Sequence, residues 1–235
     1  MKLTHRMQAV ASLVTPGRKV ADIGCDHGYL PIYLVENHIA PSAVAMDINE
    51  GPLKAARKNI QKEGLQDKIK TRRSDGLKEL LESEGESVII AGMGGRLVIK
   101  ILTQSIDILK KDSGVKELIL QPQSEQAFFR SSMRELGYVC VKEDMVFEDG
   151  KYYPMGKYVK GQEQVTSETS LFDEYGPLLL KEKNTVLWQY VLKEQENLMK
   201  IEESLTEMKE GAQKELRKKE LQEKMRRNQA AQNFF

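Results

Sequence analysis

The sequence has few of the features that mark secreted, metal-binding or membrane proteins. Its 235 residues include two cysteines, Cys25 and Cys140, which form neither a disulfide framework nor a CxxC pair. Three histidines argue against a metal site built from several imidazoles. No apolar run approaches the roughly 20 residues of a membrane span, and the apolar stretch near the N-terminus ends at Thr15 and Pro16, too early for a signal peptide. We therefore expect a cytoplasmic protein with free thiols, no metal and no membrane contact.

An excess of one charge is also absent. The chain has 36 Lys and Arg residues against 35 Asp and Glu residues, a formal net charge of +1. The chain as a whole therefore lacks the positive field that attracts nucleic acid, so any nucleic-acid-binding site has to be a local cluster of cations. With 40% hydrophobic and 30% charged residues, the composition is that of a folded globular chain with one or two domains.

The composition changes near residue 161, which predicts one domain over residues 1–160 and another over 161–235. The second begins with a polar linker at 161–170. In the first, strand-like runs are predicted at Arg18–Ile23, Ser42–Met46, Ile69–Arg73, Ser87–Ala91 and Glu117–Leu120. Helical stretches are predicted between them at Leu30–Asn37, Pro52–Glu63, Leu77–Glu82, Arg96–Lys110 and Ser124–Leu136. This alternation predicts an α/β fold with a parallel sheet and right-handed crossovers.

Two further strands are predicted at the end of the first domain. Tyr138–Glu148 and Lys151–Val159 are joined by Asp149-Gly150. An Asp-Gly pair between two strands favours a type I′ turn. The sequence therefore predicts a parallel sheet that ends in an antiparallel hairpin.

The C-terminal part has the apolar spacing of a coiled coil. Apolar residues recur at intervals of three, four or seven, with Glu194 interrupting one core position. They are Leu187, Val191, Leu198, Ile201, Leu205, Met208 and Ala212. We expect a helical hairpin with a break near Gly211; the alternative is one uninterrupted helix that dimerises.

The clearest functional motif follows the first predicted strand. Asp22 is followed by Gly24, Cys25, Asp26, His27 and Gly28, a spacing of Asp-x-Gly-x-x-x-Gly. It is neither the Gly-x-Gly-x-x-Gly turn of dinucleotide sites nor a P-loop. Those motifs hold phosphates on backbone N–H groups, whereas an acid before the glycines suits an amine-bearing or cationic ligand. S-adenosylmethionine carries both an amino-acid end and a sulfonium.

Three more motifs follow later strands, where open α/β sheets bind ligands. Asp47 comes 23 residues after Gly24 and is placed to accept hydrogen bonds from ribose hydroxyls. Asp75-Gly76 is placed to contact an adenine amino group, and the glycines after Ala91 let backbone approach a ligand. Singly, each motif is also explained as a turn or helix cap. Together they predict cofactor binding by Asp22, Gly24, Cys25, His27, Gly28, Asp47, Ile48, Asp75, Gly76, Ala91, Gly92 and Met93.

These motifs extend into longer segments that resemble one family. The segments are Leu3–Met7, Ala21–Ile32, Ala45–Leu53, Ala91–Gly95 and Leu120–Gln123. The whole chain resembles the bacterial TrmK family of tRNA adenine-N1 methyltransferases. The resemblance implies a Rossmann-like class I S-adenosylmethionine-dependent methyltransferase domain and a C-terminal helical coiled-coil domain. It also implies methyl transfer from S-adenosylmethionine to N1 of adenine 22 in the D-loop region of tRNA.

Methylation at adenine N1 makes particular demands on the site. The neutral ring nitrogen attacks without deprotonation, so the protein mainly positions the reactants, and a carboxylate stabilises the cationic product. Asp26 is our first candidate, with loop support as its alternative role, and Tyr29 is a candidate for stacking on a flipped base. The Asn/Asp-Pro-Pro-aromatic segment of many amino-directed methyltransferases is missing after the fourth predicted strand. The predicted catalytic residues are Asp26, Tyr29, Gln121 and Pro122.

Binding of tRNA requires cations that contact phosphates. Local clusters supply the candidates Arg72, Arg73, Arg96, Lys100, Lys214, Arg217, Lys218 and Arg226. Three other functions stay open on the motifs alone. They are methylation of another RNA, a protein or a small molecule, a non-catalytic cofactor-binding module with a helical recruiting arm, and, more weakly, a nicotinamide dehydrogenase. The residues do not fix the oligomeric state, although a monomer is favoured.

Overall fold

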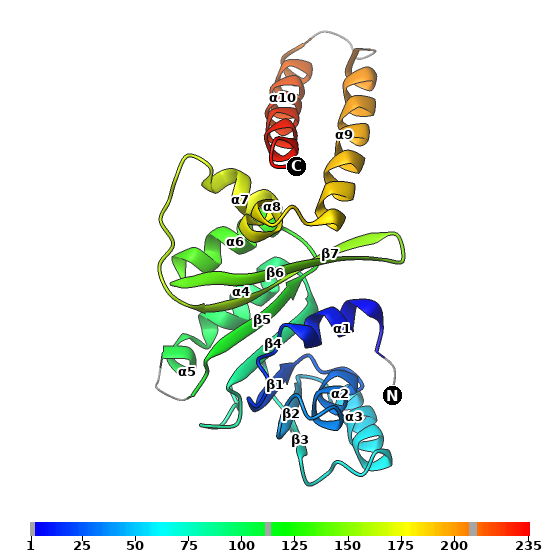
Figure 1. The fold of residues 1–235 in the computed structure, drawn as a ribbon, viewed down its shortest axis with the longest axis vertical. Helices are drawn as coiled ribbons and strands as arrows, with labels where there is room; N and C mark the ends of the chain where they lie inside the picture. The colour runs from blue at the N-terminus through cyan, green and yellow to red at the C-terminus, as the bar shows by residue number, and fades with distance from the viewer. Residues whose placement is uncertain (1–2, 111–113, 207–210) are drawn as a thin grey trace. The chain divides into compact units, whose positions relative to one another are not determined.

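The computed structural model describes residues 3–110, 114–206 and 211–235. The chain divides into two compact units, Met1–Gln164 and Val165–Phe235, coloured blue to yellow-green and yellow to red in Figure 1. No helix of the described residues is long and apolar enough to cross a membrane. The first unit contains a single sheet whose carboxyl edge organises the candidate site.

The sheet has seven strands in the order β3-β2-β1-β4-β5-β7-β6 (Figure 1). Strands β1 to β5 are parallel, β7 is antiparallel to β5, and β6 is antiparallel to β7. The strands are β1 (Val20–Ile23), β2 (Ala43–Asp47), β3 (Ile69–Arg73), β4 (Ser87–Met93), β5 (Glu117–Pro122), β6 (Tyr138–Glu148) and β7 (Lys151–Lys160). Because all five parallel strands run the same way, their carboxyl ends converge on one edge.

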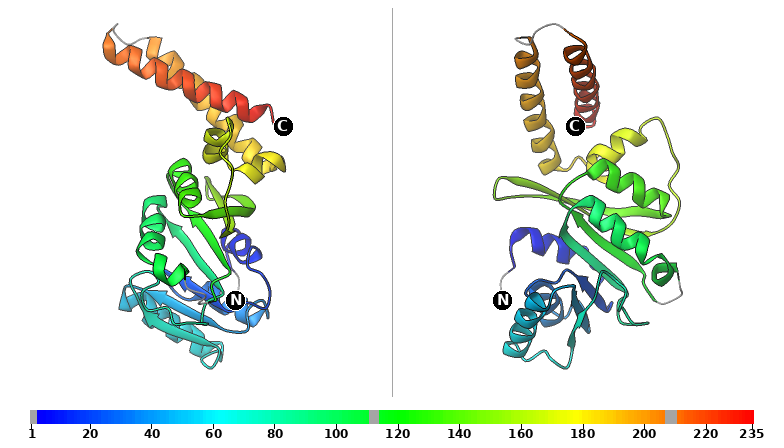
Figure 2. Two further views of the ribbon diagram at one scale, coloured as in Figure 1. Left: turned by 90° about the vertical axis from the view of Figure 1, so that its left-hand side faces the viewer. Right: turned by 180° about the vertical axis from the view of Figure 1, so that it is seen from behind.

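Helices pack on both faces of the sheet, as the period-2 alternation of strand side chains requires. Val20 and Ile89 belong to a core cluster shared with the first three helices, whereas their neighbours Ala21 and Ile90 belong to a cluster shared with the next three. The first layer holds α1 (His5–Ser12), α2 (Tyr29–Glu36) and α3 (Glu50–Lys62). The second holds α4 (Gly95–Gln104), α5 (Ile106–Lys110) and α6 (Gln126–Glu135). Figure 2 lets the reader follow this unit from two further sides.

Two helix predictions for this unit were wrong. Residues 77–82 form turns rather than a helix, because the Ser74 hydroxyl accepts a hydrogen bond from the Glu79 N–H and holds the segment in a tight loop. The helix predicted over 96–110 is divided at the buried Ser105 into α4 and α5. Helix α1 was not predicted. Its N-cap is Thr4, whose hydroxyl accepts a hydrogen bond from the Met7 N–H.

A buried carboxylate joins the N-terminal loop to the centre of the sheet. Glu117 on β5 accepts hydrogen bonds from Thr15, from the Ser87 hydroxyl at 2.7 Å and from Arg18 at 2.7 Å, and its carboxylate lies 3.3 Å from the Lys157 ammonium. Burial opposes the charged form, but these donors hold the pKa of Glu117 below its ordinary value. The network therefore ties β4, β5 and β7 to the segment before β1.

The second unit consists of helices and connecting turns, with no strand among its described residues. It contains α7 (Thr169–Tyr175), α8 (Pro177–Lys181), α9 (Thr185–Thr206) and α10 (Ala212–Gln232). Helices α9 and α10 pack against one another and bury Leu187, Val191, Leu198, Leu205 and Leu221. Two predicted core positions are wrong, because Ile201 is 48% exposed and Ala212 is exposed; Met208 lies outside the described residues. Helix α9 is described to Thr206 and α10 from Ala212, and residues 207–210 between them lie outside the described part of the chain.

Glu194, the acid that interrupts the apolar spacing, accepts hydrogen bonds from three side chains. Glu194 accepts hydrogen bonds from the hydroxyls of Tyr175 at 2.5 Å and Tyr190 at 3.3 Å, and from the Asn228 amide at 2.9 Å. Asn228 is 2% exposed and also donates to the Val191 carbonyl. A polar cluster that joins three helices in this way fixes one register between α9 and α10.

We predict that Glu117→Gln lowers the free energy of unfolding by about 2–4 kcal/mol, because it leaves Arg18 and Lys157 facing a neutral group in a buried site. The measurement is urea denaturation at pH 7. Glu135→Gln, at an exposed position on α6, is the control and should cost less than about 0.5 kcal/mol. Since the pKa of Glu117 is lower in the folded state, the difference should shrink as the pH falls below the ordinary value of 4.5. A difference that stays constant down to pH 3 would contradict this account.

Candidate active site

The loop after β1 is fixed to the neighbouring strand by its backbone. The N–H groups of Gly24 and Cys25 both donate to the Met46 carbonyl, at 2.8 and 3.0 Å. Gly24 has φ +77°, and a Cβ atom there would lie 2.3 Å from the Met93 side chain. Only glycine therefore lets the chain turn at this point while Met93, at the end of β4, lies against it. Three strand ends meet at this residue.

Glycine is also required at the start of α2. Gly28 has φ +72° and is the N-cap of α2, and a Cβ atom there would lie 3.0 Å from Ala56 on α3. The preceding carbonyl, that of His27, accepts a hydrogen bond from the Asn59 amide at 2.9 Å. Helix α3 therefore holds the second end of the loop, while the Met46 carbonyl of β2 holds the first.

A pocket of about 500 Å³ opens at this edge of the sheet. This volume is typical of small-molecule sites. Its walls come from the start of the chain, the loop after β1, the end of β4 and the segment after β5. The lining residues are Leu3, Thr4, Arg6, Met7, Asp22, Gly24, Cys25, Asp26, His27, Tyr29, Leu30, Ala91, Gly92 and Gln123. Eight of these are among the predicted cofactor-binding and catalytic residues.

Asp22 is the buried acid of this pocket. It is 5% exposed at the centre of β1. Burial, followed by repulsion from Asp47 and Asp26, raises the pKa of Asp22 to about 7. Such a carboxyl group gains from a positively charged ligand group, which would restore its ionised form. Burial also raises the pKa of the neighbouring Cys25 thiol, so this cysteine is a packing residue rather than a nucleophile.

Asp47 and Ile48 lie at the end of β2 beside the pocket, although they are not among its lining residues. One Asp47 oxygen accepts a hydrogen bond from the Asn49 N–H at 2.8 Å. The Ile48 side chain is 52% exposed, and its carbonyl accepts from Arg73 at 3.0 Å. This placement leaves the second Asp47 oxygen available for a ligand at the carboxyl edge.

The third predicted cofactor motif is also outside the pocket lining. Asp75 pairs with Lys78, and this hydrogen bond lowers the pKa of Asp75. Gly76 packs against Ile101 of α4. Both residues follow β3 at the same sheet edge as Asp47.

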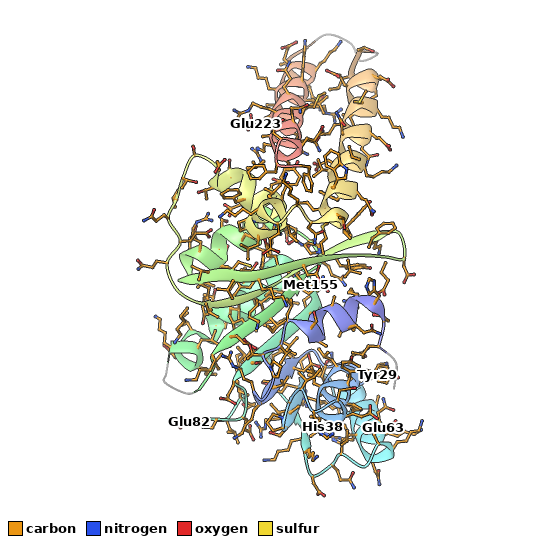
Figure 3. The ribbon with its side chains drawn as sticks, in the orientation of Figure 1. Tyr29, His38, Glu63, Glu82, Met155 and Glu223 are labelled. Atoms are coloured by element: carbon orange, nitrogen blue, oxygen red, sulfur yellow. The ribbon has the colours of Figure 1, made fainter. Side chains whose placement is uncertain are left out.

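Asp26, His27 and Tyr29 form an exposed group on the pocket rim. Asp26 adopts φ +48° and its side chain is 75% exposed. Its carboxylate lies 3.4 Å from His27 Nε2, and the His27 ring stacks on Tyr29 at 5.4 Å between centroids. Figure 3 shows Tyr29 at the start of α2. In the described part of the chain no backbone N–H donates to the Asp26 carboxylate, and the contact that it does make is with the neighbouring His27.

Gln121 and Pro122 are buried below the pocket rather than in its lining. The Gln121 amide oxygen accepts from Arg6 at 2.8 Å and from the Gly92 N–H at 3.2 Å. Arg6 also lies over the Tyr153 ring at 5.2 Å. Gln121 therefore links α1 to the end of β4, and the pocket-facing member of its segment is Gln123.

Residues at the start of the chain also line the pocket, and the motifs at the strand ends did not predict them. Leu3, Thr4, Arg6 and Met7 line the pocket although they precede the first strand. The only sequence signal for them was the resemblance of residues 3–7 to the family. Hydrophobic periodicity could not predict these residues, because α1 lies beside the pocket only through tertiary packing.

The predicted RNA-binding residues are spread over both units. Arg72 is half-buried and pairs with Glu84, and Arg73 donates to the Ile48 carbonyl. Arg96 and Lys100 are exposed on α4. In the second unit, Lys214, Arg217, Lys218 and Arg226 lie on α10, where Arg226 pairs with Glu223, the residue labelled in Figure 3. These cations therefore come from several elements of the two units.

The pocket residues fit S-adenosylmethionine. Asp22 is a buried acid of the pocket lining, which suits the positively charged amino group of the cofactor, and the bare backbone at Gly92 permits close approach. Asp47 lies at the strand end where a ribose is bound in sheets of this kind. The described residues contain no cluster of three metal-ligating side chains.

Comparisons with known proteins agree with this geometry. A methyltransferase domain family matches residues 3–155. The tRNA (adenine(22)-N(1))-methyltransferase of Bacillus subtilis (strain 168) is 34% identical over 228 residues, which cover 96% of this chain and 94% of the relative.

Two solved structures extend the match to the fold. The crystal structure of the B. subtilis m1A22 tRNA methyltransferase TrmK superposes with a TM-score of 0.84 at 33% identity, covering 98% of each chain. Sp1610 of Streptococcus pneumoniae, in complex with S-adenosyl-L-methionine, gives a TM-score of 0.83 at 33% identity over 98% of this chain and 99% of that one. The chain therefore belongs to the TrmK family of S-adenosylmethionine-dependent tRNA (adenine(22)-N(1))-methyltransferases.

Proposed function

We propose that this protein transfers the methyl group of S-adenosylmethionine to N1 of adenine 22 in tRNA. The observation that carries the proposal is the match to a tRNA (adenine(22)-N(1))-methyltransferase over 96% of the chain. A non-catalytic module and a methyltransferase with another substrate are not favoured by this match. We further propose that the enzyme acts in the cytoplasm, where its substrate would be found.

At this edge of the sheet, in the pocket and beside it, each predicted residue would have a defined task. When bound, S-adenosylmethionine supplies a methyl group on a positively charged sulfur, and this charge passes to the base with the methyl. Asp22 would hold the amino group of the cofactor and Asp47 its ribose hydroxyls. Cys25, His27, Ala91 and Met93 would shape the walls around it, while Ile48, Asp75 and Gly76 would surround the adenine at the adjacent strand ends.

The target adenine would enter from the rim. The carboxylate of Asp26 would lie near the ring that becomes cationic and stabilise the developing charge. Tyr29, already aligned by stacking on His27 at 5.4 Å, would stack on the flipped base. Gln121 and Pro122 would act indirectly, since Gln121 fixes the Gly92 N–H and Arg6 from below.

The helical unit would bind tRNA outside the target loop. We propose that residues 1–160 form the catalytic domain, that 161–235 form a linker and a coiled-coil domain, and that cations on α10 contact phosphates. Double-stranded RNA is recognised mainly by shape and phosphate contacts, which suits a helical pair with few exposed aromatic residues.

The direct test is to incubate the purified protein with unmodified tRNA and S-adenosylmethionine and to map the product by mass spectrometry. The proposal predicts 1-methyladenosine at position 22. Methylation at another nucleotide, or no incorporation while the cofactor still binds, would overturn it.

We predict that cofactor affinity depends on pH through Asp22. Because the pKa of this group is about 7 in the free protein, binding of a cationic amino group below pH 7 requires loss of a proton. The dissociation constant should therefore rise roughly tenfold per pH unit below 7 and stay flat above it. Asp22→Asn should remove this dependence and weaken binding about 10- to 100-fold at pH 8. Isothermal titration calorimetry with S-adenosylhomocysteine measures both effects, and the exposed Asp67→Asn serves as the control. An unchanged pH profile in Asp22→Asn would contradict the assignment.

We predict that Asp26→Asn lowers kcat about 10- to 100-fold, because it removes the charge that stabilises the cationic base. Asparagine tolerates the positive φ of this position, so the loop should keep its conformation. Cofactor affinity should change less than about threefold. A loss of cofactor binding equal to the loss of activity would instead indicate that Asp26 supports the loop.

We predict that the double variant Lys214→Gln and Lys218→Gln weakens tRNA binding about 5- to 20-fold in low salt. Two lost phosphate contacts should also reduce the slope of log K against log salt by about 1.4 to 1.8. The measurement is fluorescence anisotropy with labelled tRNA over a salt series. Lys200→Gln, an exposed change on α9, is the control and should leave the slope unchanged. If both variants behave alike, α10 is a solvated face and not a tRNA contact.

A further inference from the structure

An aromatic side chain that the core does not use lies at the start of α6. Phe129 and Met133 of this helix are 1% exposed and pack under the sheet, with the Phe129 ring edge-on to Tyr158. The preceding residue, Phe128, is 38% exposed on the other side. The Arg96 guanidinium lies over its ring at 4.7 Å. Packing of the fold therefore does not account for Phe128.

This aromatic residue lies close to the mouth of the pocket. Helix α4 follows β4 and helix α6 follows β5, so the starts of both helices are at the carboxyl edge of the sheet. Gln123 lines the pocket. Two residues later, Glu125 pairs with Arg96, a separation of at most ~7 Å along the backbone. Phe128 is five residues after Gln123, so the two backbone positions are at most ~18 Å apart, within reach of a nucleotide that flanks the target base.

The charge around Phe128 is suited to a phosphate backbone. Arg96 is 70% exposed in its side chain and contacts Glu125 through Nε alone. Lys100 lies one helical turn further along α4, is exposed, and forms no ion pair with any described residue. An exposed aromatic ring beside two exposed cations is the combination by which proteins bind unpaired nucleotides.

We infer that Phe128, Arg96 and Lys100, here called the Phe128 platform, bind the tRNA nucleotide next to the target adenine. Its base would stack on Phe128, while Arg96 and Lys100 would contact the flanking phosphates. Flipping the target out of its stack leaves a neighbouring base without a stacking partner, and the aromatic ring would replace that partner. This inference rests on the proposed function, because it takes an unpaired tRNA loop as the ligand.

The test compares Phe128→Ala with Phe147→Ala in the full-length protein. Phe147 is a matched control, since it is 47% exposed and contacts another aromatic ring, that of Tyr152 at 4.6 Å, but lies on the hairpin of β6 and β7. Binding of unmodified tRNA is measured by anisotropy, and cofactor binding by calorimetry. We expect Phe128→Ala to weaken tRNA binding about 5- to 50-fold, Phe128→Trp to retain it, and Phe147→Ala to change it less than twofold. Cofactor affinity should be unchanged in all three.

A salt series separates the roles of the three residues. Arg96→Gln and Lys100→Gln should each reduce the slope of log K against log salt by about 0.7, whereas Phe128→Ala should lower affinity at every salt concentration with the slope unchanged. Equal affinities for Phe128→Ala and Phe147→Ala would overturn the inference. So would loss of cofactor binding in Phe128→Ala, since it would indicate a distorted site.

The measurements distinguish a failure of the proposed methyl transfer from a failure of the Phe128 platform. If the wild-type protein binds tRNA but produces no 1-methyladenosine at position 22, the proposed function fails, and the binding comparison still tests the platform. If the wild-type protein methylates position 22 and Phe128→Ala binds tRNA normally, only the inference about the platform fails.

Discussion

The candidate site depends on the contact between the Gly24 turn and the two neighbouring strands. Two backbone N–H groups of this turn share the Met46 carbonyl, and the Met93 side chain occupies the space that a side chain at residue 24 would need. This contact brings together the ends of β1, β2 and β4. Because the ends meet here, three acids in or just after these strands, Asp22, Asp26 and Asp47, share one small region. Burial and, after it, repulsion from Asp47 and Asp26 raise the pKa of Asp22.

An acidic pocket suits this reaction in particular. Both the methyl donor and the methylated adenine are cationic, so a positive charge is present before and after transfer. Carboxylates placed along this path lower the cost of bringing the charge into a partly dry site. The ring nitrogen needs no base, and positioning together with charge stabilisation is enough. The cations that we propose for tRNA binding are not among the residues that line the pocket; they lie on α4 and α10.

Much of this fold could be predicted from the sequence, since strand patterns and turn residues are local signals. The five parallel strands and the Asp149-Gly150 turn were found in this way. The turn at 77–82 was missed because it depends on one side-chain hydrogen bond from Ser74. The break at Ser105 and the N-terminal wall of the pocket were missed because they arise from tertiary packing. Glu194 was identified as an interruption, but its partners Tyr175 and Asn228 could not be inferred from spacing.

The site was predicted less completely than the fold. Spacing identified the residues around the Gly24 turn because each follows a strand. It could not show that Gln121 is buried below the pocket, or that Asp75 is engaged by Lys78. It also gave no sign that Phe128 is exposed while its neighbour Phe129 is in the core, since both rings look alike in a helical pattern. Burial and side-chain partners of this kind depend on the tertiary structure and not on local sequence.

The most direct test of the account uses two synthetic tRNAs that differ at nucleotide 22 alone, one with adenine and the other with 1-deazaadenine, which lacks the accepting nitrogen. Methyl incorporation from labelled S-adenosylmethionine is followed to completion. The account predicts one methyl group per molecule of the adenine tRNA and none in the deaza tRNA, which should still bind. Equal incorporation into both would show that the acceptor lies elsewhere and would contradict the assignment of this site.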